Sequence, residues 1–146
     1  MTSRRFALLL GILLLLMGVA GFVPALVRPA DDVHGLSLDG GTPLLFGWFG
    51  ARALNNVVRI ALGAAALVSA RSMDEAVRGC RRAAGAFLLL AICGVVPGLD
   101  TMFGLMSLYG NDIWLHGLLF LLCLYYGWIH HNPAPPQAPE SSAQPL

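Results

Sequence analysis

The sequence contains no lysine, and charged residues make up only 12% of its 146 positions. A soluble domain of this size carries roughly 25% charged residues. Because 57% of the residues are hydrophobic, the scarcity of charge indicates a protein of the lipid bilayer and argues against a soluble catalytic domain. The arginines form no basic patch larger than Arg78, Arg81 and Arg82, which excludes a nucleic-acid-binding surface.

Cysteine is also scarce, and Cys80, Cys93 and Cys123 lie far apart without a C-x-x-C pair. This spacing excludes a disulfide framework and a paired-thiol redox site. Cys93 and Cys123 fall within apolar runs and are predicted to be small buried hydrophobes. Cys80 lies between arginines, a basic setting in which a lowered thiol pKa is an open alternative.

Long apolar runs are what the chain has in abundance, and there are four of them: residues 6–27, 51–70, 83–99 and 112–129. About 20 helical residues cross the hydrocarbon core of a bilayer. The sequence therefore predicts an all-α fold, an integral membrane bundle of four transmembrane helices in up-down-up-down order, over residues 1–131. Residues 132–146 are rich in proline and are predicted to form a disordered tail.

The arginines also predict the orientation of the bundle. They gather before the first run and between the second and third, whereas in the other two connections acids predominate or basic residues are absent. Arginine near span ends marks the cytoplasmic side, so both termini are predicted to be cytoplasmic in a multi-pass protein of the bacterial inner membrane. A cleaved signal peptide is the alternative for the first run, because Arg4 and Arg5 precede it, although the run is longer than the usual signal sequence.

The second run carries polar residues at helical spacing: Arg52, Asn55, Asn56 and Arg59. Offsets of three, four and seven residues return to the same side of a helix. A guanidinium in hydrocarbon is costly unless it faces protein or water. Arg59 is therefore predicted to point into the bundle, toward a partner.

Asp112 and His116 supply a second polar face, one helical turn apart at the start of the fourth run. In the predicted topology they lie at the same depth as Arg59. We expect a buried polar cluster in which Asp112 neutralises Arg59, while Asn55, Asn56 and His116 supply hydrogen bonds. Such a cluster is first of all a structural device that fixes the register of four apolar helices.

Function is less constrained. The sequence favours a noncatalytic structural or accessory component, whose partners are the lipid bilayer and either a homo-oligomer or another membrane protein. The alternative is a small transporter or channel in which Arg59, Asn55 and His116 line a water-filled cavity.

A metal or redox enzyme is disfavoured, since haem needs two facing histidines and only His116 lies within a run. No enzymatic activity, metal or cofactor is therefore expected. Asp31, Asp32 and His34 are interpreted as part of a solvated loop, because three such residues lack a fourth ligand.

Short motifs around this polar face resemble an uncharacterised bacterial four-helix membrane family, catalogued as domain of unknown function 4383. They are residues 45–47 (Leu-Phe-Gly), 55–59 (Asn-Asn-Val-Val-Arg) with Gly63, and 111–116 (Asn-Asp-Ile-Trp-Leu-His).

The resemblance covers residues 6–128 and implies a four-helix membrane fold. Members of that family typically show His-Asn-x-x-His in place of residues 55–59, and an Asp followed four residues later by His, as at Asp112 and His116. Asn55 and Arg59 replace both histidines of the first motif. The resemblance therefore implies an ion pair where relatives hold a candidate ligand site, and leaves the activity open.

Overall fold

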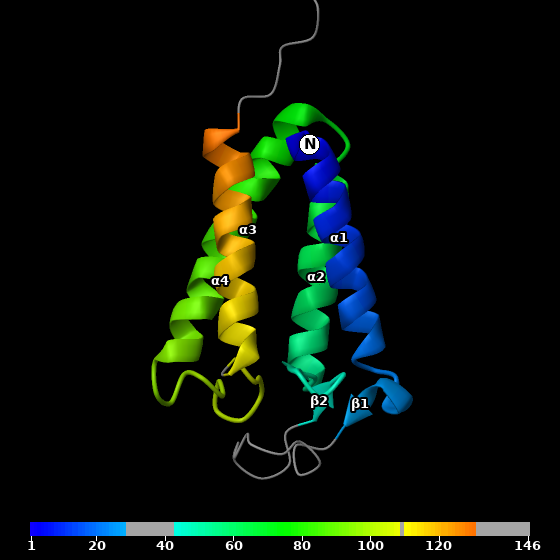
Figure 1. The fold of residues 1–146 in the computed structure, drawn as a ribbon, viewed down its shortest axis with the longest axis vertical. Coiled ribbons are helices and arrows are strands. Elements are labelled where there is room, and N and C mark those ends of the chain that lie inside the picture. The colour runs from blue at the N-terminus through cyan, green and yellow to red at the C-terminus, as the bar shows by residue number, and fades with distance from the viewer. Residues whose placement is uncertain (29–42, 109, 131–146) are drawn as a thin grey trace, which may run out of the picture.

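The computed structural model describes residues 1–28, 43–108 and 110–130 (Figure 1). Its main elements are four helices: α1 (Ser3–Ala20), α2 (Ala53–Ser69), α3 (Met73–Val95) and α4 (Asn111–Leu124). A π-helical segment, η3 (Tyr125–Ile129), continues α4. The predicted all-α class is therefore confirmed at the level of a mainly helical fold. The proline-rich tail and the loop with Asp31, Asp32 and His34 lie outside the described residues.

The first helix is shorter than the apolar run that encodes it. Thr2 caps α1 by accepting a hydrogen bond from the backbone N–H of Arg5 at 3.3 Å. The helix ends at Ala20, and Pro24 begins the short 3-10 turn η1 (Pro24–Leu26). Proline lacks an N–H and its ring would clash with the carbonyl four residues earlier, which is that of Ala20. The prediction of one helix over residues 6–27 is therefore wrong at its C-terminal end.

The third helix begins earlier than predicted. The hydroxyl of Ser72 accepts a hydrogen bond from the N–H of Glu75 at 3.2 Å, and an acidic residue in the first turn suits the helix dipole. The connection between α2 and α3 is therefore a tight turn, and α3 includes most of the arginine-rich segment that precedes residue 83. The helix ends at Val95, two residues before Pro97, which cannot continue it.

A small antiparallel sheet lies at the end of the bundle away from the start of α1 (Figure 1). Its strands are β1 (Val27–Arg28), β2 (Leu44–Leu45) and β3 (Phe49–Gly50), in the order β1-β2-β3. Leu45 pairs with both Val27 and Phe49, and Leu44 pairs with Gly50. Strands of two residues are too short to show a periodicity of two, so sequence analysis did not predict this sheet.

The helices pack as two pairs, α1 with α2 and α3 with α4. Glycine allows the first pair to approach closely. A Cβ atom at Gly11 would lie 2.9 Å from the backbone oxygen of Gly63, and one at Gly18 would lie 2.8 Å from that of Asn56. Larger residues at these glycines would force the two helices apart.

Three long-range hydrogen bonds show which helix ends lie together. Arg4 Nε donates to the carbonyl of Ala70 at 2.9 Å, Ser3 Oγ donates to that of Tyr126 at 2.9 Å, and Arg81 Nε donates to that of Gly127 at 2.7 Å. The start of α1, the α2–α3 turn and the end of η3 therefore share one end of the bundle (Figure 1). We call it the arginine end, because the following residues belong to it: Arg4, Arg5, Arg71, Arg78, Arg81 and Arg82.

Apolar side chains fill the interior and also cover much of the outside. The largest buried cluster joins all four helices: Phe6, Leu10, Leu14, Ala66, Cys80, Ala84, Phe87, Leu119 and Cys123. Large hydrophobic side chains also remain exposed on the outer faces, such as Leu16 (65%), Leu89 (61%) and Trp114 (79%). By length and composition, two helical segments, α1 and α4 with η3, are able to cross a membrane, and α2 is a shorter apolar helix.

Candidate functional site

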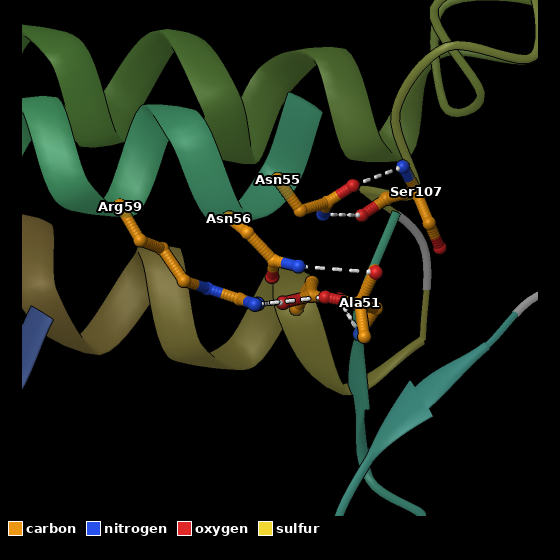
Figure 2. Close-up of polar contacts among 7 residues, drawn as sticks. Ala51, Asn55, Asn56, Arg59 and Ser107 are labelled. Atoms are coloured by element: carbon orange, nitrogen blue, oxygen red, sulfur yellow. Dashed lines mark hydrogen bonds and ion pairs between the residues drawn. The ribbon is translucent and has the colours of Figure 1, made fainter. Parts of the chain in front are cut away.

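A polar cluster is buried near the sheet, where α2, α4 and β3 meet (Figure 2). Asn55, Asn56 and Arg59 lie on the first two turns of α2, and Asp112 and His116 on the first two turns of α4. All five side chains are buried. The helical spacing read from the sequence explains why each group of side chains shares one face of its helix.

The centre of the cluster is an ion pair. Arg59 Nη2 lies 2.7 Å from Asp112 Oδ1, and both side chains are almost fully buried. The backbone of Gly50 closes a ring around this pair: its N–H donates to Asp112 Oδ2 at 2.6 Å, and its carbonyl accepts from Arg59 Nη1 at 2.8 Å. Both carboxylate oxygens therefore accept a hydrogen bond, and these bonds offset the free-energy cost of removing the two charges from water.

Gly50 is a member of the site that sequence analysis missed. A Cβ atom there would lie 2.8 Å from the Cβ of Ser107 and 2.9 Å from Asp112 Oδ2. Glycine is thus required for the backbone to approach the carboxylate. The interacting groups are its N–H and carbonyl, which every residue except proline carries, so the sequence holds no signal for this role.

Asn55 forms a second connection, to the loop between α3 and α4. Its Nδ2 donates to the carbonyl of Ser107 at 2.6 Å, and its Oδ1 accepts from the N–H of the same residue at 2.9 Å (Figure 2). One amide therefore satisfies both backbone groups of a buried residue. Ser107 is the second residue that sequence analysis missed, again because it contributes backbone atoms.

Asn56 makes a local contact. Its Nδ2 donates to the carbonyl of Ala51 at 3.2 Å (Figure 2). Its Oδ1 has no hydrogen-bond partner among the residues that the structure describes, and α1 approaches it at Gly21. Asn56 therefore holds the chain just before α2 and does not join the ring around Arg59.

Arg52, predicted to belong to the buried polar cluster, and His116, expected to supply a hydrogen bond to it, both lie outside the ring around Arg59. Arg52 is half-buried at the edge, where its Nη1 donates to the carbonyl of Gly104. His116 is buried and its ring stacks on Phe87, with the ring centroids 6.1 Å apart. Its Nδ1 has no hydrogen-bond partner within the described chain. Within the described chain, His116 thus lies beside the ion pair and forms no hydrogen bond with it.

A cavity of about 10 Å³ lies beside the cluster and is lined by Asn55, Arg59 and His116 together with apolar side chains such as Leu62 and Phe87. A buried water needs about 10 to 15 Å³ and two or more polar partners. The cavity therefore has the size of a single water molecule and lacks the room for a substrate.

The chemistry open to this arrangement is that of a fixed ion pair. Each carboxylate oxygen of Asp112 already accepts a hydrogen bond from another member of the ring. Among residues 1–28, 43–108 and 110–130, no three His, Cys, Asp or Glu side chains converge to form a candidate metal site. What the geometry does supply is a mechanical link between α2, β3 and α4.

Comparison with known proteins identifies the family but supplies no activity. No protein with a curated description and no solved structure matches the chain. One family profile, described as Domain of unknown function (DUF4383), matches residues 4–129. This range contains all four helices and the whole polar cluster, so the chain belongs to the DUF4383 family.

Proposed function

We propose that the chain is a multi-pass protein of the bacterial inner membrane, with four crossings and both termini in the cytoplasm. The arginine end supports this orientation, because arginine collects on the cytoplasmic side of span ends. α1 and α4 with η3 have the length and composition of spans. The 17 residues of α2 cover about 25 Å, and the crossing part of α3 begins at residue 83, after its last arginine.

The outer surface of the bundle supports a lipid environment. Leu16, Leu89 and Trp114 are each more than half exposed, and they lie on three different helices. Soluble monomers rarely expose large contiguous apolar surfaces. Lipid contact removes the cost of this exposure.

We further propose that the protein is a noncatalytic structural or accessory component, with a homo-oligomer or another membrane protein as its partner. One observation carries this proposal: Arg59, Asp112 and Gly50 satisfy one another in a closed ring beside a cavity of about 10 Å³. A transporter or channel with the same polar face needs a continuous path for water, and a space for one water molecule does not favour it.

Membrane integration is tested by alkaline carbonate extraction of membranes that contain the protein. We expect the chain to remain in the pellet. Release into the supernatant would overturn the proposed spans. An Asp74→Cys variant, exposed at the arginine end, tests orientation, because it is expected to react with an impermeant thiol reagent in inside-out vesicles only.

Exclusion of bulk water from the polar cluster is tested by thiol labelling. His116→Cys is introduced into a chain that lacks Cys80, Cys93 and Cys123. A small water-soluble methanethiosulfonate reagent is expected to leave this position unmodified in membranes. Phe103→Cys, at a side chain 88% exposed in the loop between α3 and α4, is the matched control and is expected to react. Equal labelling of both positions would favour the transporter or channel.

A further inference from the structure

A groove lies between the end of α2 and the start of α3, separate from the polar cluster. It has a volume of about 630 Å³, within the range of about 300 to 1,000 Å³ typical of ligand pockets. Its α3 side extends from Glu75 to Ala86, about 16 Å along the axis, so it runs from the arginine end toward the middle of the bundle.

Most of the side chains along the walls of this groove are small. The small ones are Ala65, Ala66 and Ser69 on α2, and Gly79, Ala83 and Ala86 on α3, and the larger Leu62 and Val68 of α2 also line it. At Gly79 the two helices nearly touch, because a Cβ atom there would lie 2.3 Å from Ser69 Oγ. The walls between the helices are therefore mainly apolar.

The mouth of the groove is positively charged. Arg71 and Arg82 line it, and neither guanidinium forms a hydrogen bond or ion pair with the residues that the structure describes. Glu75 also lines the mouth, but it is paired with Arg78, and this pairing lowers the pKa of Glu75. The carboxylate pairs with Arg78 and attracts Arg82 more weakly, and the mouth, where Arg71 and Arg82 face this one acid, keeps a net positive charge.

We propose that this groove binds a phospholipid with an anionic headgroup, with one acyl chain between α2 and α3 and the phosphate between Arg71 and Arg82. Guanidinium groups bind phosphate through paired hydrogen bonds, and basic pockets between helices on the cytoplasmic side are suited to anionic headgroups. The inference rests on the membrane setting proposed above, because only there does a headgroup meet the arginine end.

The test uses the full chain purified in detergent and titrated with phosphatidylglycerol or with phosphatidylcholine of the same acyl chains, with bound lipid counted by native mass spectrometry. We expect phosphatidylglycerol to bind about twenty-five-fold more tightly, from about fivefold for each of the two arginines. The double variant Arg71→Gln/Arg82→Gln is expected to lose this preference. Arg5→Gln, an exposed arginine at the same end of the bundle, is the charge control and is expected to change binding less than twofold.

A second pair of variants tests the acyl-chain part of the groove. Ala65→Phe fills the groove and is expected to weaken binding of both lipids at least fivefold. Ala64→Phe, on the neighbouring exposed position of α2 outside the groove, is expected to bind as the unmodified chain does. Inorganic phosphate at millimolar concentration is expected not to displace the lipid.

Three results would overturn the proposal. They are equal affinity for the two lipids, an unchanged preference in Arg71→Gln/Arg82→Gln, and full displacement by inorganic phosphate. If the chain forms a dimer and binds no lipid, and Ala65→Phe dissociates this dimer, the groove is assigned to a second copy of the chain. Carbonate extraction and thiol labelling at position 116 are independent of these results, so failure here is distinguishable from failure of the proposed function.

Discussion

The two partners of the buried ion pair are predicted to be strongly coupled, so that removal of both costs much less than the sum of the two single removals. Arg59→Leu leaves Asp112 charged and buried, and Asp112→Leu does the same to Arg59. An unpaired buried charge costs about 3 to 5 kcal/mol, so the two single losses sum to about 6 to 10 kcal/mol. The double variant leaves only the N–H and carbonyl of Gly50 unpaired, at about 1 to 3 kcal/mol each.

The double variant is therefore expected to lose about 2 to 6 kcal/mol, with a coupling energy of about 4 kcal/mol between the two positions. The assay is the free energy of unfolding of the four proteins in mixed micelles, measured by denaturant titration. Glu75→Ala and Arg78→Ala form the control cycle, since this ion pair is exposed and its coupling is expected to be far smaller. Losses that add to within about 0.5 kcal/mol would refute the ion pair as the central link.

Further predictions concern the contacts around the cluster and the helix packing. Asn55→Ala leaves the N–H and carbonyl of Ser107 unpaired and is expected to lower the free energy of unfolding by about 2 kcal/mol or more; an unchanged value would contradict this bidentate contact. Gly63→Leu places a Cβ 2.9 Å from a backbone oxygen of α1 and is expected to lower Tm. Gly85→Ala is the control, because no atom lies within 4 Å of its Cβ, and it is expected to stabilise the helix by about 0.5 to 1 kcal/mol. Equal shifts in Tm for the two variants would exclude close packing of α1 on α2. Cys80 precedes the proposed crossing of α3, and burial raises the pKa of its thiol to about 11. The thiol is therefore expected to resist N-ethylmaleimide at pH 7.5 until the protein unfolds. Rapid labelling of the folded protein would instead support a reactive Cys80 with a lowered pKa.

The helices and their polar faces were accessible from the sequence because side-chain periodicity encodes them. The spacing of Asn55, Asn56 and Arg59 places them on one face of α2, and that of Asp112 and His116 places them on one face of α4; all five side chains are buried. The end of α1 was misjudged because the apolar run continues beyond Pro24, and hydrophobicity outweighed the backbone effect of proline.

The remaining contacts were hidden because they use backbone atoms. Gly50 and Ser107 satisfy Asp112 and Asn55 through N–H and carbonyl groups, which carry no residue-specific signal. Gly50 is placed by the pairing of β3 with β2, and strands of two residues are too short to show a periodicity in the sequence. His116 shares the face of Asp112 as predicted, but its contact with Phe87 is a ring stack, which spacing along one helix does not reveal.

The ring formed by Arg59, Gly50 and Asp112 has a consequence for biosynthesis. Arg59 on α2 and Gly50 on β3 precede the α2–α3 turn, while Asp112 is made more than 50 residues after Arg59. In the proposed membrane, the newly inserted first hairpin must hold Arg59 with only the carbonyl of Gly50 as its partner until the second hairpin arrives. An incomplete chain thus carries the uncompensated charge of Arg59, which the complete chain pairs with Asp112. This unpaired charge is a local feature by which membrane quality control distinguishes unfinished chains.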